Sequence, residues 1–272
     1  MYPKKVIHYQ TEHYSIHLPN ESKTYKALNR LMGKALHHYQ MVADGDRILV
    51  GVSGGADSLT LMWLLSERQS RIPVDYELFA VYVDPGFHES FGEPLKTYCE
   101  QNGFFLRVEY TDYGVLGHSS VNRENPCFLC SRLRRKRLFE IAAELGCNKL
   151  AFGHNKDDII ETLFMNICYA GEISTMLPAQ TFFQEKFTLI RPLSYADEEL
   201  IRRFAREQNF PDFENPCPTS KTSKRQEIKF LLKRLYRSNK NVKGNIFRAM
   251  SHVKPDYLLR LPDQLNGSST ER

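Results

Sequence analysis

The sequence lacks several features that would assign it to common protein classes. Its 272 residues contain no apolar run of bilayer length, and residues 1–5 are not followed by an apolar signal segment, so we expect a cytoplasmic protein with no membrane partner. The six cysteines are then expected to be thiols or metal ligands rather than disulfides. No segment repeats another, and the length suits one large domain with a small appendage.

The glycine-rich segment at residues 51–58 (GVSGGADS) has neither the spacing of a P-loop nor that of a dinucleotide-binding fingerprint. It follows a short apolar run and precedes an apolar pattern of helical period, which predicts a strand, a tight turn and a helix. Two adjacent glycines would let the backbone approach an anion, and two serines would add hydroxyl donors. These residues are Ser53, Gly54, Gly55 and Ser58. We interpret the segment as a pyrophosphate cradle; the alternative is a structural glycine turn.

Strands and helices are expected to alternate along the chain. Apolar strands are predicted at residues 48–52, 77–84, 105–111, 149–152 and 187–193, with helical patterns between them. This alternation predicts right-handed crossover units and hence an α/β fold with a doubly wound parallel sheet. Such sheets bind ligands at the carboxyl ends of their strands, which predicts that Val83 lies near a nucleotide.

We expect three parts in the chain. Residues 1–44 would form an N-terminal arm and helix, residues 45–210 a nucleotide-binding domain that includes a Cys-x-x-Cys loop, and residues 211–272 a lone cysteine and a basic helical tail. Residues 1–20 would be an arm or an edge hairpin. The helix at residues 22–41 would cover a sheet edge or form a dimer contact, so a homodimer is an expected assembly.

Positive charge is concentrated in two places. The net charge is +5, yet residues 221–272 hold 13 Lys and Arg against 4 Asp and Glu, and residues 132–137 hold five further cations. Such clusters favour a polyanionic partner larger than a nucleotide; the alternative is a solvated helical face. The candidate contacts are Arg132, Arg134, Arg135, Arg137, Lys224 and Arg225.

A second polar segment, residues 153–162 (GHNKDDIIET), begins where a parallel strand gives way to a helix. Its side chains are expected to face the same crevice as the glycine-rich segment. There His154 would contact the α-phosphate region of a nucleotide, and Asp57 and Asp158 would hold Mg²⁺. The alternative is that the acidic residues only cap the helix.

Cys127 and Cys130 form a Cys-x-x-Cys pair, which suits half a zinc site, a redox dithiol or part of an iron–sulfur site. No second close pair completes a four-cysteine zinc site. Cys217 is a third candidate because its Asn-Pro-Cys context repeats that of Cys127. Three thiolates suit a [4Fe–4S] cluster with one iron open to a sulfur species; a zinc site completed by histidine, or a redox pair unrelated to Cys217, are alternatives.

Together these motifs resemble the tRNA 2-thiocytidine synthetase family of PP-loop ATP pyrophosphatases, over about residues 45–237. The resemblance implies that ATP adenylates the C2 oxygen of cytidine 32 in the anticodon loop, and that sulfur carried on a [4Fe–4S] cluster then displaces AMP. It also implies that tRNA and a sulfur donor, either a cysteine desulfurase persulfide or sulfide, are the partners. The implied catalytic and cluster residues are Asp57, Cys127, Cys130 and Cys217. The implied ATP site comprises Ser53, Gly54, Gly55, Asp57, Ser58, His154 and Asp158.

The chain departs from this family at one position and leaves other hypotheses open. The family commonly has lysine where this chain has Ala56, so Arg132 or Lys156 is expected to supply a cation beside the pyrophosphate. Residues 1–34 contain no cysteine, which argues against the related position-54 thiolases with N-terminal zinc-binding motifs. The alternatives are a PP-loop ligase similar to tRNA lysidine synthetase, a thiolase of another nucleobase, and a non-catalytic RNA-binding protein with structural zinc.

Overall fold

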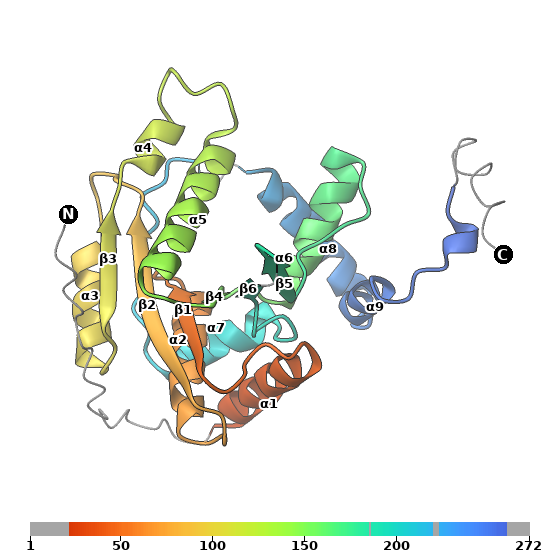
Figure 1. Ribbon diagram of the computed structural model, residues 1–272. Helices are drawn as coiled ribbons and strands as arrows, with labels where there is room; N and C mark the ends of the chain where they lie inside the picture. Colours follow the sequence, from red (N-terminus) through yellow and green to blue (C-terminus); the bar gives the residue numbers. More distant parts are fainter. Residues whose placement is uncertain (1–21, 185, 220–222, 260–272) are drawn as a thin grey trace. The chain divides into compact units, whose positions relative to one another are not determined.

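The computed structural model describes residues 22–184, 186–219 and 223–259 (Figure 1). By its backbone contacts the chain divides into two units, Met1–Gln226 and Glu227–Arg272, and the first contains the whole sheet. The arm predicted for residues 1–20 lies outside the described residues. The helix predicted after it is α1 (Lys23–His38), which packs on α7 (Glu198–Glu207) within the first unit.

Six strands form one sheet in the order β3-β2-β1-β4-β6-β5. Neighbouring strands pair in parallel as predicted among β1 (Asp46–Gly51), β2 (Tyr76–Asp84), β3 (Leu106–Tyr110), β4 (Lys149–Ala151) and β6 (Phe187–Ile190). The predicted α/β fold class is therefore confirmed. One strand was not predicted: β5 (Ala179–Phe182) pairs antiparallel with β6, and its short sequence AQTF carries no apolar run that would mark it.

Helices connect the strands and complete the chain. The first unit also contains α2 (Ala56–Gln69), α3 (Gly92–Gln101), α4 (Tyr113–Gly117), α5 (Pro126–Glu144), α6 (Lys156–Met165) and the π-helical turn η1 (Asn166–Ala170). Most of α8 (Lys224–Ser238), with α9 (Val242–Ala249) and the short η2 (Pro255–Tyr257), belongs to the second unit. None of the helices in the described residues is both long and apolar enough to span a bilayer.

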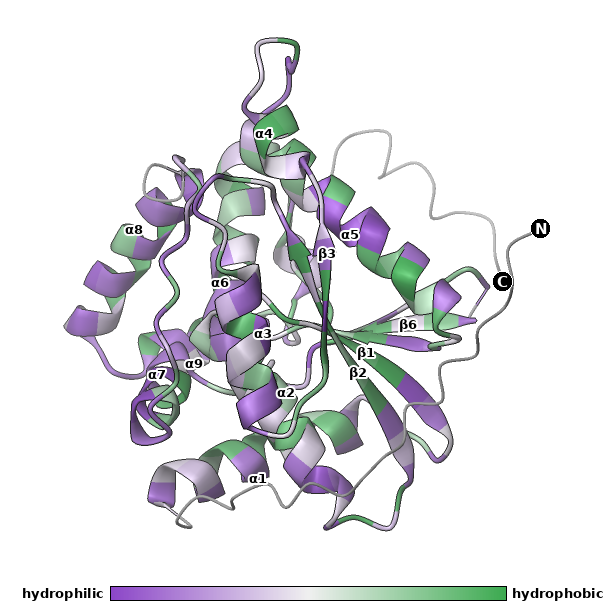
Figure 2. Cartoon of the chain, turned by 90° about the vertical axis from the view of Figure 1, so that its left-hand side faces the viewer, coloured by the Kyte–Doolittle hydropathy of each residue, from purple (hydrophilic) through white to green (hydrophobic). Residues whose placement is uncertain are grey.

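The two faces of the sheet pack against different helices (Figure 2). In β1 the side chains of Ile48 and Val50 point to one face and that of Leu49 to the other, because strand side chains alternate. The first face packs against α1, α2, α3 and α7. On the second face Leu49 packs with Leu138 and Ile141 of α5. A site at the carboxyl end of β1 can therefore be lined by α2 from one face and by α5 from the other.

Helix α5 begins earlier than expected. Pro126 stands in its first turn, and the side chain of Asn125 accepts hydrogen bonds from the backbone N–H groups of Cys127 (3.0 Å) and Phe128 (3.3 Å). An asparagine cap followed by proline favours the start of a helix. The prediction of a cysteine loop ahead of the helix is therefore wrong, because Cys127 and Cys130 lie within α5. The segment before α5 contains the short helix α4.

Candidate active site

The glycine-rich turn connects β1 with α2. Gly54 has a φ of +80°, which favours glycine, and a Cβ at this position would lie 2.7 Å from the ring of Phe91. The hydroxyl of Ser58 accepts a hydrogen bond from the backbone N–H of Ser53 (3.0 Å) and donates one to the carbonyl of Gly55 (3.0 Å). The turn is thereby held at the N-terminus of α2, an arrangement that binds anions.

A cavity of about 340 Å³ opens beside this turn, at the carboxyl ends of β1, β2 and β4. It is lined by the turn, the start of α2, the end of β2, helix α5 and the segment after β4. The lining residues are Gly51, Val52, Ser53, Asp57, Ser58, Val83, Ser131, Arg134, Arg135, Leu138, Phe152, Gly153, His154 and Asp158. They include six of the eight residues that the sequence assigned to nucleotide binding; the other two, Gly54 and Gly55, form the turn itself.

Gly153 brings the segment after β4 against the start of α2. A Cβ on Gly153 would lie 2.8 Å from the carbonyl carbon of Asp57, so a larger residue would push the two segments apart. This close approach sets Asn155 beside Asp57, and the Asn155 amide donates a hydrogen bond of 2.9 Å to the Asp57 carboxylate. The two predicted motifs are thus joined by a direct contact between their side chains.

Asn155 also caps α6 and was missed by the sequence reasoning. Its Oδ1 accepts hydrogen bonds from the backbone N–H groups of Asp157 (2.9 Å) and Asp158 (3.2 Å). In return Asp158 Oδ2 accepts one from the backbone N–H of Asn155 (2.9 Å), which completes a capping box. The spacing Asn-x-x-Asp could have indicated this cap. Asp158 therefore caps the helix, as one alternative expected, and also lines the cavity.

The pKa of the Asp57 carboxyl group is higher than usual. Burial raises its pKa to about 6, the hydrogen bond from Asn155 opposes this rise, and the negative charges of Asp158 and Glu198 add to it. Carboxylates in such surroundings are characteristic of functional sites. Among the described residues, no three His, Cys, Asp or Glu side chains stand close enough to hold a metal ion as a group.

His154 lines the same cavity as a neutral ring. Its Nδ1 is buried and has no hydrogen-bond partner in the described part of the chain. Burial, together with the positive charges of Arg191, Arg225 and Arg135, lowers its pKa to about 3. Burial and the charge of Arg135 also lower the pKa of Arg191, to about 10. The surroundings of His154 are therefore strongly positive, which favours a phosphate-rich ligand.

Helix α5 supplies the cations beside the glycine-rich turn. Arg134 and Arg135 line the cavity. The Nε of Arg134 is buried and makes no hydrogen bond within residues 22–184, 186–219 and 223–259. These two arginines can supply the positive charge that a lysine in place of Ala56 would bring. These two side chains reach the cavity because of the way α5 packs against the sheet. The run of cations in the sequence does not by itself show which of them face the cavity.

Arg132 and Lys156 are the two cations that the sequence predicted beside the pyrophosphate, and each forms an ion pair with an acidic residue. Arg132 pairs with Glu124 at 3.1 Å, and Lys156 pairs with Asp197 at 3.4 Å. Neither residue lines the cavity. The structure therefore does not support Arg132 or Lys156 as the replacement for the lysine, and Arg134 and Arg135 are the cations beside the cavity.

Two of the three predicted cluster thiols, those of Cys127 and Cys217, contact Thr219. Its hydroxyl oxygen lies 3.3 Å from Sγ of Cys127 and 3.4 Å from Sγ of Cys217. Burial raises the pKa of Cys130, and Arg134 opposes that rise. The thiols of Cys217 and Cys127 raise the pKa of Cys130 further, so the third thiol stands near the other two. A pair and a lone cysteine that lie far apart in the sequence thus meet in one place.

The repeated Asn-Pro-Cys motif adopts a repeated geometry. The backbone N–H of Cys127 donates to Oδ1 of Asn125, and that of Cys217 donates to Oδ1 of Asn215, both at 3.0 Å. The intervening proline restricts the backbone between each pair. Each asparagine therefore fixes the backbone of the cysteine that follows it. Cys99, in contrast, is fully buried in the core.

His118 and Thr219 are further site residues that the sequence reasoning missed. Nε2 of His118 lies 3.1 Å from the Thr219 hydroxyl, and Nδ1 lies 2.8 Å from the carbonyl oxygen of Gly114. Because a carbonyl oxygen only accepts, Nδ1 carries the proton in the neutral ring and Nε2 is free to accept. No motif marks His118 in the sequence; α4, which ends just before it, packs on α5, and His118 contacts Thr219.

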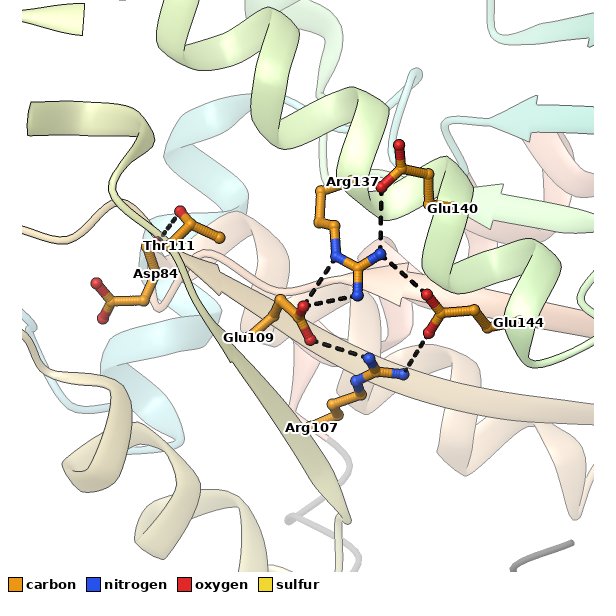
Figure 3. A network of polar contacts seen from close by, with 7 residues as sticks. All are labelled: Asp84, Arg107, Glu109, Thr111, Arg137, Glu140 and Glu144. Atoms are coloured by element: carbon orange, nitrogen blue, oxygen red, sulfur yellow. Dashed lines mark hydrogen bonds and ion pairs between the residues drawn. The ribbon is translucent and has the colours of Figure 1, made fainter. Parts of the chain in front are cut away.

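Arg137, which was expected to contact RNA, is held in a network of ion pairs (Figure 3). It binds Glu109 (2.7 Å), Glu140 (3.2 Å) and Glu144 (2.9 Å). Arg107 binds two of the same carboxylates, Glu109 at 2.9 Å and Glu144 at 3.1 Å. The network joins α5 to β3, so we assign Arg137 a structural role and no longer expect it to contact RNA.

The remaining expected RNA contacts are distributed over several environments. Arg134 and Arg135 line the cavity. Arg225 pairs with Glu161 at 3.3 Å, and the ammonium of Lys224 lies 5.5 Å from the centre of the Tyr169 ring. The cations expected to contact RNA therefore have different neighbours and do not form one continuous group.

The strand order, the glycine-rich turn and the cavity beside it define a PP-loop ATP-binding protein. The sequence accordingly matches the PP-loop domain family over residues 21–235. Two relatives named tRNA-cytidine(32) 2-sulfurtransferase are 39% identical (Geobacter sulfurreducens) and 38% identical (Geotalea daltonii) to it. These alignments cover 87% and 88% of this chain and 93% and 96% of the relatives. The chain belongs to the tRNA-cytidine(32) 2-sulfurtransferase family, which confirms the resemblance noted in the sequence.

A solved structure supports the same assignment. The chain is similar to the U34-tRNA thiolase NcsA from Methanococcus maripaludis with its [4Fe-4S] cluster, with a TM-score of 0.70 and 26% identity. The similarity covers 85% of this chain and 80% of that chain.

Proposed function

We propose that this chain is an ATP-dependent tRNA sulfurtransferase that replaces the C2 oxygen of cytidine 32 in the anticodon loop by sulfur. The observation that carries the proposal is the arrangement along α5. Cys127 and Cys130 lie at the start of this helix, and Ser131, Arg134 and Arg135 line the cavity directly behind them. Activation of the base and delivery of sulfur can therefore occur at adjoining positions, without release of an intermediate.

The first step is adenylation of the base. The C2 oxygen of cytidine attacks the α-phosphorus of ATP, and pyrophosphate leaves toward the glycine-rich turn. Backbone N–H groups at the start of α2, with Arg134 and Arg135, stabilise the charge that develops on the leaving group. Asp57 and Asp158 would hold Mg²⁺ together with phosphate oxygens, which is the donor set this ion prefers. His154 would contact the α-phosphate as a neutral ring.

The second step exchanges AMP for sulfur. Cys127, Cys130 and Cys217 would hold a [4Fe–4S] cluster. Their thiols fit it because Cys127 and Cys217 both contact Thr219, and Cys130 lies one turn along α5 from Cys127. When bound, such a cluster supplies an iron position that accepts sulfur from an external donor. We propose free sulfide as that donor, or a persulfide of a cysteine desulfurase together with an external two-electron reductant that converts its outer sulfur to sulfide. Arg134 lies near Cys130 and also lines the cavity, so the two halves of the site adjoin.

Anaerobic purification followed by iron and acid-labile sulfide assays tests the metal centre. About four irons and four sulfides per chain are expected for the wild type. Cys217→Ala should lose most of both, together with the 2-thiocytidine that mass spectrometry detects in tRNA incubated with ATP and sulfide. Cys168→Ala is the matched control because Cys168 is exposed on η1, and it should retain iron, sulfide and product.

Other results would favour the alternative functions. One zinc per chain without sulfide would overturn the sulfur-transfer step and favour a three-cysteine zinc site completed by a histidine. His118 is the candidate histidine because its Nε2 lies 3.1 Å from the Thr219 hydroxyl, which also contacts Cys127 and Cys217. If wild-type protein with tRNA releases no pyrophosphate from ATP, the adenylation step is overturned and a non-catalytic RNA-binding protein is favoured.

A further inference from the structure

One row of side chains on α5 leads out of the nucleotide cavity. Ser131, Arg135 and Leu138 line the cavity, and Phe128 continues their row because positions three and four apart share a helix face. Phe128 stands one turn closer to the N-terminus of α5. Its side chain is 58% exposed, although it is large and apolar. The row therefore ends in an exposed aromatic residue one helical turn beyond the cavity-lining Ser131.

Phe128 also lies beside the two cysteines along the first turn of α5. Phe128 directly follows Cys127, whose Sγ contacts Thr219, and the backbone N–H of Phe128 is fixed by the side chain of Asn125 at 3.3 Å. The guanidinium of Arg132 lies 5.4 Å from the centre of the Phe128 ring. The ring thus has a fixed backbone, a neighbouring cation and an exposed surface.

A single exposed aromatic residue is common on protein surfaces and by itself indicates nothing. Phe105 is 61% exposed and directly precedes β3, which places it at the amino edge of the sheet, away from the carboxyl ends where the cavity opens. Phe128 differs from it because it shares a helix row with three cavity-lining residues and directly follows a cysteine of the predicted cluster.

We infer that Phe128 is the surface on which an unpaired base of the anticodon loop stacks, with Arg132 contacting the neighbouring phosphate. This inference rests on the proposed function and adds a specific positioning residue to it. Unpaired RNA bases are commonly stacked on aromatic side chains, and a guanidinium beside the ring adds a contact to the backbone. Stacking on Phe128 would hold the target cytidine with its C2 carbonyl between the cavity and the thiols.

The test uses the full chain with its metal centre and a fluorescent anticodon stem-loop RNA. Phe128→Ala should weaken RNA binding about 5- to 150-fold, which is the usual effect of losing one stacked base. Phe128→Tyr keeps a ring and should bind within about twofold of wild type. Phe105→Ala is the control of similar exposure and should bind as wild type does. All variants should retain iron and sulfide, because Phe128 and Phe105 are not cluster ligands.

A second measurement reports stacking directly. Pyrrolocytidine at position 32 should lose fluorescence when wild-type protein binds the RNA, and the quenching should be much smaller with Phe128→Ala. Equal RNA affinity and equal quenching for wild type and Phe128→Ala would overturn the inference. Unchanged RNA binding with slower sulfur uptake from a persulfide donor would assign the ring to a protein partner and overturn it too.

The outcome for the wild type separates this inference from the proposed function. If the wild type forms 2-thiocytidine and Phe128→Ala binds RNA equally well, only the role of Phe128 fails. If the wild type binds RNA with Phe128-dependent quenching but forms no 2-thiocytidine, the reaction fails and the stacking role stands. If the wild type does not bind the stem-loop, both are overturned.

Discussion

The side-chain amide of Asn155 donates a hydrogen bond of 2.9 Å to the carboxylate of Asp57, and this contact joins the start of α6 to the start of α2. Asn155 has two separable functions, since its Oδ1 caps α6 while its Nδ2 holds Asp57. Both motifs that the sequence assigned to nucleotide binding therefore depend on one amide.

Substitutions at Asn155 should separate these functions. Asn155→Ala removes both, so the free energy of unfolding should fall by about 1 kcal/mol and binding of a non-hydrolysable Mg·ATP analogue should weaken. Asn155→Ser keeps a capping oxygen, so it should weaken nucleotide binding with little loss of stability. Urea denaturation and calorimetric titration measure the two effects. Wild-type nucleotide affinity in Asn155→Ser would contradict a role for the contact with Asp57.

Gly54→Ala should disrupt the glycine-rich turn for two reasons. Alanine disfavours the φ of +80°, and its Cβ would lie 2.7 Å from the ring of Phe91. Gly45→Ala is the matched control because Gly45 has a φ of +77° with nothing within 4 Å of a Cβ. Both variants should lose about 1 kcal/mol of stability from the backbone alone. Only Gly54→Ala should also lose tRNA-dependent pyrophosphate release; an equal loss in both would contradict the argument.

Arg135 and Lys136 are adjacent cations with different surroundings. Arg135 lines the cavity, whereas Lys136 pairs only loosely with Glu140, at 3.9 Å. Arg135→Ala should weaken binding of a non-hydrolysable ATP analogue about 10- to 150-fold, the usual effect of losing a charged hydrogen bond. Lys136→Ala should leave the affinity within about twofold, because an exposed ion pair contributes little. Equal affinities for the two variants by calorimetry would remove Arg135 from the site.

His154 should make the stability of the protein depend on pH. Burial and the nearby arginines lower its pKa to about 3 in the folded chain, whereas the unfolded chain binds this proton near pH 6.5. The unfolded state therefore binds more protons between these values, so the free energy of unfolding should fall as the pH falls from about 6.5 toward 3. His154→Asn removes this contribution, and its melting temperature should decline less over the same range. If the melting temperatures of the wild type and of His154→Asn change with pH in parallel, the lowered pKa of His154 is contradicted.

The sequence by itself determined the fold class and the chemical types in the site. The alternation of apolar strands with helical patterns predicted the parallel sheet, because right-handed crossovers leave few other arrangements. Adjacent glycines and serines after β1 marked an anion site, since few other sequences allow a backbone to approach phosphate so closely. The repeated Asn-Pro-Cys context selected Cys217 among four single cysteines, and that motif does adopt a repeated geometry.

Only the tertiary structure decided which neighbours these residues have. The antiparallel β5 depends on pairing with β6, not on its own residues. The arginines of α5 have different neighbours: Arg134 and Arg135 line the cavity, Arg137 belongs to an ion-pair network, and Arg132 lies near the ring of Phe128. These neighbours depend on how α5 packs on one face of the sheet. Tertiary packing also brings Thr219 to Cys127 and Cys217, and His118 to Thr219. The periodicity of a sequence predicts which residues lie on the same face of a helix. It does not predict which distant segments that face contacts, because those contacts depend on packing in three dimensions.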